Sequence, residues 1–186
     1  IAEWIAHNAK VLDLGCGDGS LLSQLRKTHN IRGYGVEKDD ANWLKAMNNG
    51  VDVIQMDLES GLSGFEAQSF DVVILSQTLQ AVLNTEAIVH EMLRVGREVI
   101  VTFPNFGYWR HRIQIMTGNM PVSDNLPYQW YDTPNVHLCT INDFDDFCRK
   151  SNIKVQQRLV LTDKKEVHLM PNIRGSLAMY RLRSGQ

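Results

Sequence analysis

The sequence contains few cysteines, and they do not form a pattern typical of cross-links or metal modules. Cys16, Cys139 and Cys148 are the three cysteines among 186 residues, and no two of them form a Cys-x-x-Cys pair. Small disulfide-stabilised domains and zinc modules need more cysteines at regular spacing. We therefore exclude a disulfide framework and expect a reducing compartment, the cytoplasm.

The sequence also lacks long hydrophobic runs and a dominant charge. Its uninterrupted apolar runs are at most four residues long, as at 72–75, whereas a membrane span needs about 18 or more. The 19 basic and 21 acidic residues give a net charge of -2, which provides no strong field for a nucleic acid or an anionic membrane. No basic segment followed by an apolar core stands near Ile1, so we expect no secretion signal. We expect a soluble protein that binds neither nucleic acid nor membrane.

What is present is an alternation of strand-like and helix-like segments. A chain of 186 residues can bury one substantial core, so we expect a single domain over residues 1–186. Alternation of this kind predicts an α/β fold whose mostly parallel sheet has helices on both faces. We expect the last two strands to form a hairpin joined by residues 163–166. The seven predicted strands are 11–14, 32–36, 51–55, 70–75, 98–103, 155–161 and 176–182.

Two of the predicted helices have clear start signals. Asn84 or Thr85 can cap a helix whose apolar residues repeat at helical spacing over 88–93. Thr140 and Asp143 form a capping-box pattern at the start of a second helix. Both helices are expected to pack their apolar sides on the sheet.

One long segment, 104–139, does not fit the alternation, and we call it the lid segment. It has 36 residues and four of the five prolines. A connection of this length in a compact domain is typically a lid or a binding loop. Because it follows the fifth predicted strand, we expect it over the carboxyl edge of the sheet, where open α/β sheets bind ligands. Its Tyr128, Trp130 and Tyr131 side chains can form a substrate cage, a protein interface or internal packing, and Tyr108 and Trp109 stand earlier in the same segment.

The clearest chemical motif is the glycine-rich stretch 15–19, Gly-Cys-Gly-Asp-Gly, directly after the first predicted strand. Glycines permit a sharp turn and a close backbone approach to a ligand, and the following helix offers free N–H groups. The spacing differs from the Gly-x-Gly-x-x-Gly of dinucleotide folds, and Asp13 stands inside the preceding strand. Glu37 ends the second strand 18 residues after Gly19, where a carboxylate can accept from both hydroxyls of a ribose. Cys16 is interpreted as a small buried side chain rather than a nucleophile.

Together with Met56-Asp57-Leu58, these residues resemble the S-adenosylmethionine (SAM) site of class I methyltransferases over residues 10–103. The resemblance implies a Rossmann-like class I methyltransferase fold with an antiparallel final strand, and SAM or S-adenosylhomocysteine (SAH) as cofactor. In that site the glycines line the methionine part of SAM, Glu37 lines its ribose, and Asp57 with the Leu58 backbone lines its adenine. Asp13 supports the amino group of the methionine part, and the backbone of Ser76 and Gln77, at the end of the fourth predicted strand, lies near the same amino group. The implied cofactor-binding residues are Asp13, Gly15, Cys16, Gly17, Gly19, Glu37, Asp57, Leu58 and Ser76.

Some of these positions also have purely structural interpretations. Asp57 is equally typical of a turn or a helix cap. Ser76 and Gln77 can simply end a strand. His111, His137 and Cys139 could be imagined as metal ligands, but their irregular spacing favours hydrogen-bonded loop residues, so we expect no metal site.

The lid segment carries a second, more selective resemblance. Its part 127–141, PYQWYDTPNVHLCTI, is similar to the MetW family of methionine biosynthesis proteins, as are 94–97 and 103–109. The resemblance covers nearly the whole chain. It implies a companion protein that supports or controls the homoserine O-acyltransferase at the start of methionine synthesis. It does not establish a methyl acceptor.

Two functions therefore stand side by side. The first, which we favour, is a SAM-responsive companion subunit, which needs differential binding and no chemistry. The second is a SAM-dependent methyltransferase acting on a small-molecule acceptor. Methyl transfer needs alignment of donor and acceptor, plus a base where the acceptor carries a proton. The candidate bases are His111, Tyr128 and His137.

Overall fold

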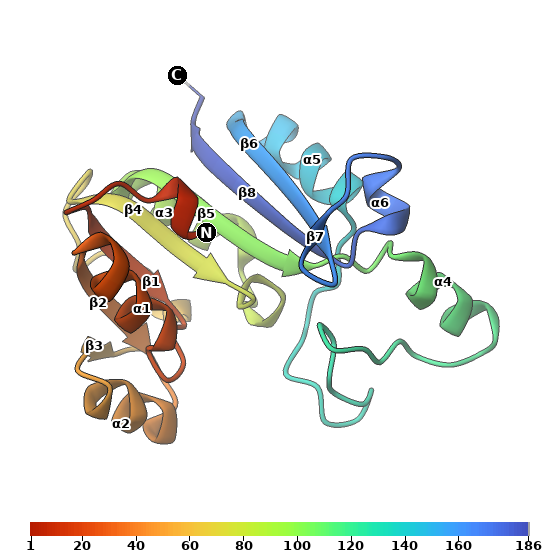
Figure 1. Cartoon of the computed structure of the whole chain (residues 1–186), viewed down its shortest axis with the longest axis horizontal. Coiled ribbons are helices and arrows are strands. Elements are labelled where there is room, and N and C mark those ends of the chain that lie inside the picture. The colour runs from red at the N-terminus through yellow and green to blue at the C-terminus, as the bar shows by residue number, and fades with distance from the viewer. Residues whose placement is uncertain (186) are drawn as a thin grey trace.

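The computed structural model describes residues 1–185, which are built around one twisted eight-stranded sheet (Figure 1). The strand order is β3-β2-β1-β4-β5-β8-β6-β7. Neighbouring strands among the first five are parallel, and β8 lies antiparallel between β5 and β6. The predicted mostly parallel sheet with an antiparallel final strand is thus confirmed. The bounds are β1 (Lys10–Leu14), β2 (Arg32–Glu37), β3 (Asp52–Gln55), β4 (Phe70–Ser76), β5 (Gly96–Pro104), β6 (Ile153–Thr162), β7 (Lys165–Glu166) and β8 (Leu177–Ser184).

The short strand β7 was not expected, and it changes how the last two long strands are joined. Thr162 pairs with Lys165, so Asp163 and Lys164 form a two-residue turn with φ of 50° and 63°. Two successive positive φ angles are typical of a type I′ hairpin turn. The chain then passes through α6 (Pro171–Arg174) before β8 pairs with β6. The stretch 163–166 does form a turn, but the hairpin that it closes is β6–β7.

Helices cover both faces of the sheet, because alternate residues of each strand point to opposite sides. In β4, Val72 belongs to the buried cluster that contains Leu25 of α1. Its neighbour Val73 belongs to the other cluster, with Met92 of α3 and Phe144 of α5. The helix bounds are α1 (Ser20–His29), α2 (Asp40–Asn48), α3 (Thr85–Val95), α4 (Trp109–Met116) and α5 (Ile141–Lys150), with the 3₁₀ turns η1 (Ala2–Trp4), η2 (Leu58–Ser60) and η3 (Leu79–Ala81).

Both predicted helix starts are confirmed. The Asn84 side chain caps α3 by accepting a hydrogen bond from the Ala87 N–H. Thr140 and Asp143 form a reciprocal capping box at α5, in which each side chain accepts from the other's backbone N–H. No helix within residues 1–185 combines the length and apolar character that crossing a membrane requires.

The lid segment contains α4 and then follows an irregular path to α5. In Figure 1 it extends from the carboxyl end of β5, on the side of the sheet away from β3. Near its end the N–H groups of Val136 and His137 both donate to the Gln80 carbonyl of η3, at 2.9 and 3.0 Å. These bonds fix the last part of the segment beside the loop that follows β4.

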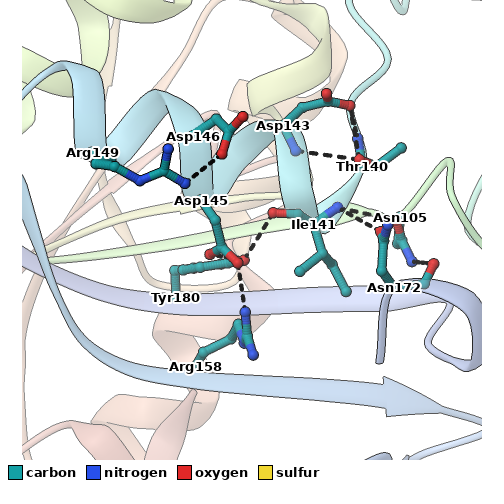
Figure 2. A network of polar contacts seen from close by, with 10 residues as sticks. All are labelled: Asn105, Thr140, Ile141, Asp143, Asp145, Asp146, Arg149, Arg158, Asn172 and Tyr180. Carbon is teal, nitrogen blue, oxygen red and sulfur yellow. Dashed lines mark hydrogen bonds and ion pairs between the residues drawn. The ribbon is translucent and has the colours of Figure 1, made fainter. Parts of the chain in front are cut away.

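The buried side chain of Asn105 ties the start of the lid segment to the elements around it (Figure 2). Its Nδ2 donates to the carbonyls of Asn172 at 3.0 Å and Gly175 at 2.7 Å. Its Oδ1 accepts from the N–H groups of Gly107 at 3.0 Å and Ile141 at 3.3 Å. One amide group therefore joins the end of β5, the start of α5 and the segment around α6.

Replacing this amide should destabilise the fold. Asn105→Ala leaves several buried backbone groups without a partner, each costing about 1–3 kcal/mol, and we expect the free energy of unfolding to fall by about 2–4 kcal/mol. Urea unfolding followed by circular dichroism measures the change. Asn142→Ala, at an exposed position of α5, is the matched control and should stay within about 0.5 kcal/mol of the parent chain. Equal stability of the two variants would contradict the role given to Asn105.

Candidate functional site

The glycine-rich loop borders a cavity of about 260 Å³ at the carboxyl ends of β1 and β2, which we call the glycine-loop cavity. Strand order reverses between β1 and β4, and open α/β sheets bind ligands at such a reversal. Five of the predicted cofactor-binding residues line the cavity, namely Gly15, Gly17, Glu37, Asp57 and Leu58. The structure thus brings together the glycine-rich loop after β1, Glu37 at the end of β2, and Asp57 and Leu58 shortly after β3.

The glycines of the loop have different local roles. All three have positive φ, which favours glycine. A Cβ on Gly17 would meet no atom within 4 Å, so its surroundings are open to the cavity. A Cβ on Gly19 would lie 2.8 Å from Val51 and 3.1 Å from the Ala46 Cβ. Gly19 therefore permits close packing of the loop on α2 and β3, and it does not line the cavity in the described chain.

The carboxylate of Glu37 holds the loop and faces the cavity at once. Oε2 accepts a hydrogen bond from the Gly17 N–H at 2.8 Å, and Oε1 accepts from Lys38 and Asp39 N–H groups at 2.9 Å each. The side chain is thus engaged in the structure of the loop as well as available to a ligand.

Asp13 is a buried acid with an unused hydrogen-bonding atom. It is 2 % exposed, and its Oδ1 has no hydrogen-bond partner in the described chain. Burial, and next the negative charge of Glu37, raise the pKa of Asp13 to about 7. Asp13 stands in β1 and does not itself border the cavity within residues 1–185. A cationic group in the cavity would favour its charged form, which suits a ligand with an amino group.

Cys16, Ser76 and Gln77 have their polar groups engaged elsewhere. The Cys16 Sγ packs beside Gly35, and burial raises the pKa of this thiol to about 12, so it is no nucleophile at neutral pH. The Ser76 hydroxyl bonds the Thr102 hydroxyl at 3.1 Å. The Gln77 N–H donates to the Thr102 carbonyl at 2.9 Å. Within residues 1–185 none of these three borders the cavity.

The Asp57 side chain caps a helical turn and also borders the cavity. Its side chain caps η2 by accepting from the Glu59 N–H at 3.0 Å, and it forms an ion pair with Lys38 at 3.5 Å. It also lines the cavity beside Leu58. The structural role therefore does not displace the binding role, and contact with adenine stays a prediction.

Several residues of the cavity wall were missed by sequence reasoning. Lys38 and Asn42 come from the loop after β2 and from α2, whereas Thr78 and Val82 flank η3. Lys38 follows Glu37 directly, so its proximity could have been inferred. Asn42 lies in the first turn of α2, whereas Thr78 and Val82 flank η3; the positions of all three depend on tertiary packing, and no motif marks them.

The three candidate bases are not brought together. His111 is fully buried, with Nδ1 3.2 Å from the Asn105 carbonyl and Nε2 3.0 Å from the Ser123 hydroxyl, and burial lowers its pKa. Tyr128 is exposed, and the His137 ring bonds the Leu83 carbonyl at 3.0 Å. None of the three borders the glycine-loop cavity in the described chain.

Residues 1–185 also contain no cluster of three His, Cys, Asp or Glu side chains suited to a metal ion.

Comparison with known sequences identifies one family over almost the whole chain. The family model described as "Methionine biosynthesis protein MetW" matches residues 1–182. The "Bifunctional methionine biosynthesis protein MetXA/MetW" of Rhodopirellula baltica is 40% identical over 169 residues, covering 86% of this chain and 27% of the relative. The "Ubiquinone biosynthesis O-methyltransferase" of Erwinia tasmaniensis is 33% identical over 117 residues, covering 55% of this chain and 48% of the relative. The chain thus spans about a quarter and about half of these relatives.

Solved structures show the same fold at low sequence identity. A SAM-dependent methyltransferase from Methanosarcina mazei has a TM-score of 0.71 at 14% identity, covering 98% of this chain and 95% of its own. One from Archaeoglobus fulgidus also has a TM-score of 0.71, at 12% identity, covering 95% and 86%. The [4+2]-cyclase SpnF has a TM-score of 0.69 at 16% identity, covering 97% and 76%. These structures confirm the class I methyltransferase fold, and a cyclase among them shows that the fold does not fix the reaction.

The raised pKa of Asp13 predicts a pH-dependent loss of stability. Between the ordinary aspartate pKa of about 3.9 and the folded value of about 7, the folded chain holds a proton that the unfolded chain releases. The free energy of unfolding therefore falls as pH rises through this window, by up to about 1.4 kcal/mol per pH unit. Asp13→Asn should gain stability relative to the parent from pH 5 to pH 7, as measured by urea midpoints. Asp52→Asn, at an exposed position of β3, controls for the amide substitution; an equal gain there would contradict the assignment to Asp13.

Proposed function

Because this chain belongs to the MetW family of methionine biosynthesis proteins, we propose that it binds SAM or SAH in the glycine-loop cavity and acts as a companion subunit of homoserine O-acyltransferase. The observation that carries the proposal is the bifunctional relative, in which a segment 40% identical to this chain shares one polypeptide with a MetXA part. Fusion places two proteins at high effective concentration, which benefits partners that act together. The three cysteines are free, in keeping with a reducing compartment, and we place the complex in the cytoplasm.

The residues of the glycine-loop cavity fit an adenosyl amino acid. The open surroundings of Gly17 leave room for the methionine part close to the backbone. Glu37 borders the cavity with a carboxylate that can accept from ribose hydroxyls. Asp13 provides a buried acid with an unpaired Oδ1 near Glu37, which suits the amino group directly or through water. Asp57 and Leu58 complete the adenine end in this proposal.

The lid segment supplies a surface suited to a protein partner. Ten of the eighteen large hydrophobic side chains that are exposed in the described chain lie between Trp109 and Leu138. Trp130 and Tyr131 are 73% and 71% exposed and pack against each other edge to face, with ring centroids 5.7 Å apart. Exposed apolar side chains gathered on one segment mark interaction sites, and tryptophan and tyrosine are enriched among the residues that dominate binding energy. We assign the acyltransferase contact to this segment.

A companion role explains why a cofactor site is combined with such a surface. SAM is formed from methionine, the product of the pathway, so its binding can report how much product is present. A ligand shifts a protein–protein equilibrium only by its difference in affinity between the free and the bound protein. The proposed regulation therefore requires that SAM or SAH affinity differ between the free chain and its complex with the acyltransferase.

The second candidate function is SAM-dependent methyl transfer to a small molecule. It is favoured by the 33% identity to the Ubiquinone biosynthesis O-methyltransferase over 55% of this chain. SAM supplies an activated methyl group when bound, and the protein has to align an acceptor with it. Of the candidate bases, His111 is neutralised by burial and hydrogen-bonded on both ring nitrogens, whereas His137 borders a neighbouring cavity. His137 is therefore the strongest of the three under this alternative.

Glu37 provides the test of the cofactor assignment. We expect one SAH per chain by calorimetry and at least a tenfold weaker affinity for Glu37→Gln, because charged hydrogen bonds to the ribose are worth about 1.5–3 kcal/mol. Since Glu37 also accepts three backbone N–H bonds, thermal melting must accompany the titration. Glu66→Gln, at an exposed loop position, is the control. A folded Glu37→Gln variant with unchanged SAH affinity would remove the ribose assignment.

Trp130 provides the test of the partner assignment. If Trp130 is an anchor, Trp130→Ala should weaken binding to purified homoserine O-acyltransferase about thirtyfold, equal to about 2 kcal/mol. SAH affinity should be unchanged, because Trp130 does not border the glycine-loop cavity in the described chain. Leu44→Ala, at an exposed position of α2, is the control for loss of an apolar side chain. If no complex forms with the parent chain and the acyltransferase rate is unaffected by it, the companion function fails and methyl transfer takes its place.

A further inference from the structure

A second cavity of about 320 Å³ lies on the other side of η3 from the glycine-loop cavity. Its wall is formed by η3, the end of β5, the first turns of α5 and residues 137–139 of the lid segment. We call it the aromatic cavity. Neither the proposed SAM site nor the exposed lid surface uses it, and under the methyl-transfer alternative only the candidate base His137 borders it.

The body of this cavity is apolar and rigid. Phe103 of β5 and Phe144 and Phe147 of α5 line it, and Phe103 and Phe144 are buried members of the main core. Their rings pack in succession, with centroids 4.8 and 5.8 Å apart. Leu138 contributes a further apolar side chain from the lid segment. Ligand sites of proteins are typically of this kind, mostly apolar and held open by a packed scaffold.

Two residues of the wall carry buried polar atoms without a partner. Gln80 Oε1 and Thr85 Oγ1 make no hydrogen bond in the described chain. Buried polar atoms are normally paired, so each calls for a missing partner. The Gln80 Nε2 already donates to the Gln77 carbonyl at 2.7 Å, which leaves Oε1 as an acceptor. A ligand that supplies an N–H or O–H donor beside an apolar body would satisfy this arrangement.

The charges around the cavity select against anions. Asp143 is the one acidic residue in its wall, and no Lys or Arg borders it among residues 1–185. Asp143 uses Oδ2 to accept from the Thr140 N–H and hydroxyl. A carboxylate or phosphate would meet the like charge of Asp143 and no Lys or Arg here, whereas an ammonium or amide would be accepted.

The turn η3 keeps the two cavities separate. Leu79 and Gln80 border the aromatic cavity, whereas Ala81 and Val82 border the glycine-loop cavity, and no described residue borders both. The Gln80 carbonyl, which accepts from two lid-segment N–H groups, holds the turn in place. The aromatic cavity is therefore a site of its own rather than an extension of the first.

We propose that the aromatic cavity is a second small-molecule site, for a neutral or cationic ligand that combines an apolar body with an amine or amide donor. The proposal does not depend on the acyltransferase or on SAM binding. It rests on the aromatic wall, the two unpaired polar atoms and the absence of Lys and Arg side chains from the described wall.

Three fluorinated compounds of matched size test the proposal on the whole chain. 4-Fluorophenethylamine, 4-fluorophenylacetamide and 4-fluorophenylacetate carry an amine, an amide and a carboxylate on the same ring. Titrations followed by ¹⁹F NMR should show saturable binding of the amine and the amide, and at least tenfold weaker binding of the carboxylate. Saturating SAH should leave amine binding unchanged. Displacement by SAH would place the amine in the glycine-loop cavity and overturn the proposal, as would equal binding of the carboxylate or no binding up to about 10 mM.

Two variants locate the bound compound. Thr85→Val removes the hydroxyl at nearly constant shape and should weaken the amine and the amide about fivefold, whereas Thr28→Val, on exposed α1, should not. Asp143→Asn should weaken the amine about threefold and leave the amide unchanged, because only the charge is lost. If Thr85→Val binds both compounds as the parent does, the site is not the aromatic cavity. If SAH does not bind at all, the SAM assignment fails while these variants still decide the second site.

Discussion

The carboxylate of Glu37 accepts hydrogen bonds from Gly17, Lys38 and Asp39, and thereby fixes the glycine-rich loop against the end of β2. The loop needs such a partner because its glycines adopt positive φ and have no side chains to pack. The same negative charge acts on Asp13 in the neighbouring strand, where it adds to the effect of burial and raises the pKa of that acid. One side chain thus fixes the geometry of the loop and, after burial, contributes to the raised pKa of the acid in β1.

At the carboxyl end of β5, the structure depends on the buried side-chain amide of Asn105. Asn105 directly follows β5 and forms hydrogen bonds with backbone groups at the start of α5 and in the region of α6. His111 and the Asn105 carbonyl continue this packing into α4. The aromatic cavity lies between β5, α5 and the end of the lid segment, and the Asn105 bonds hold the ends of β5 and α5 together, whereas Glu37 borders the glycine-loop cavity. η3 is the wall between the two.

The seven long strands and the starts of α3 and α5 followed from the sequence because each depends on local pattern, whereas α4 and α6 were not predicted. The strands alternate with helices of clear periodicity, and the caps at Asn84 and Thr140 are short-range signals. The hairpin at β7 could not be read, because its turn residues Asp163 and Lys164 include no glycine to mark positive φ.

The site was predictable in outline and not in detail. Gly17 and Gly19 belong to one motif, yet only the first borders the cavity, because α2 packs against the second. Likewise the environment of His111 is built by Asn105 and Ser123. Which glycine borders the cavity, and which residues surround His111, both depend on contacts between distant parts of the chain, which a single sequence does not display.

The stretch 127–141, whose sequence is similar to the MetW family, divides into two structural parts. Trp130 and Tyr131 are exposed, whereas residues 137–139 border the aromatic cavity. Between them, the Val136 N–H is bonded to η3, and η3 borders the glycine-loop cavity through Ala81. The proposed interface and two cavities therefore lie along one short run of backbone. A ligand in the glycine-loop cavity that holds η3 in one conformation acts on the backbone that presents the exposed aromatic side chains, which is the physical requirement for coupling between that cavity and the proposed interface.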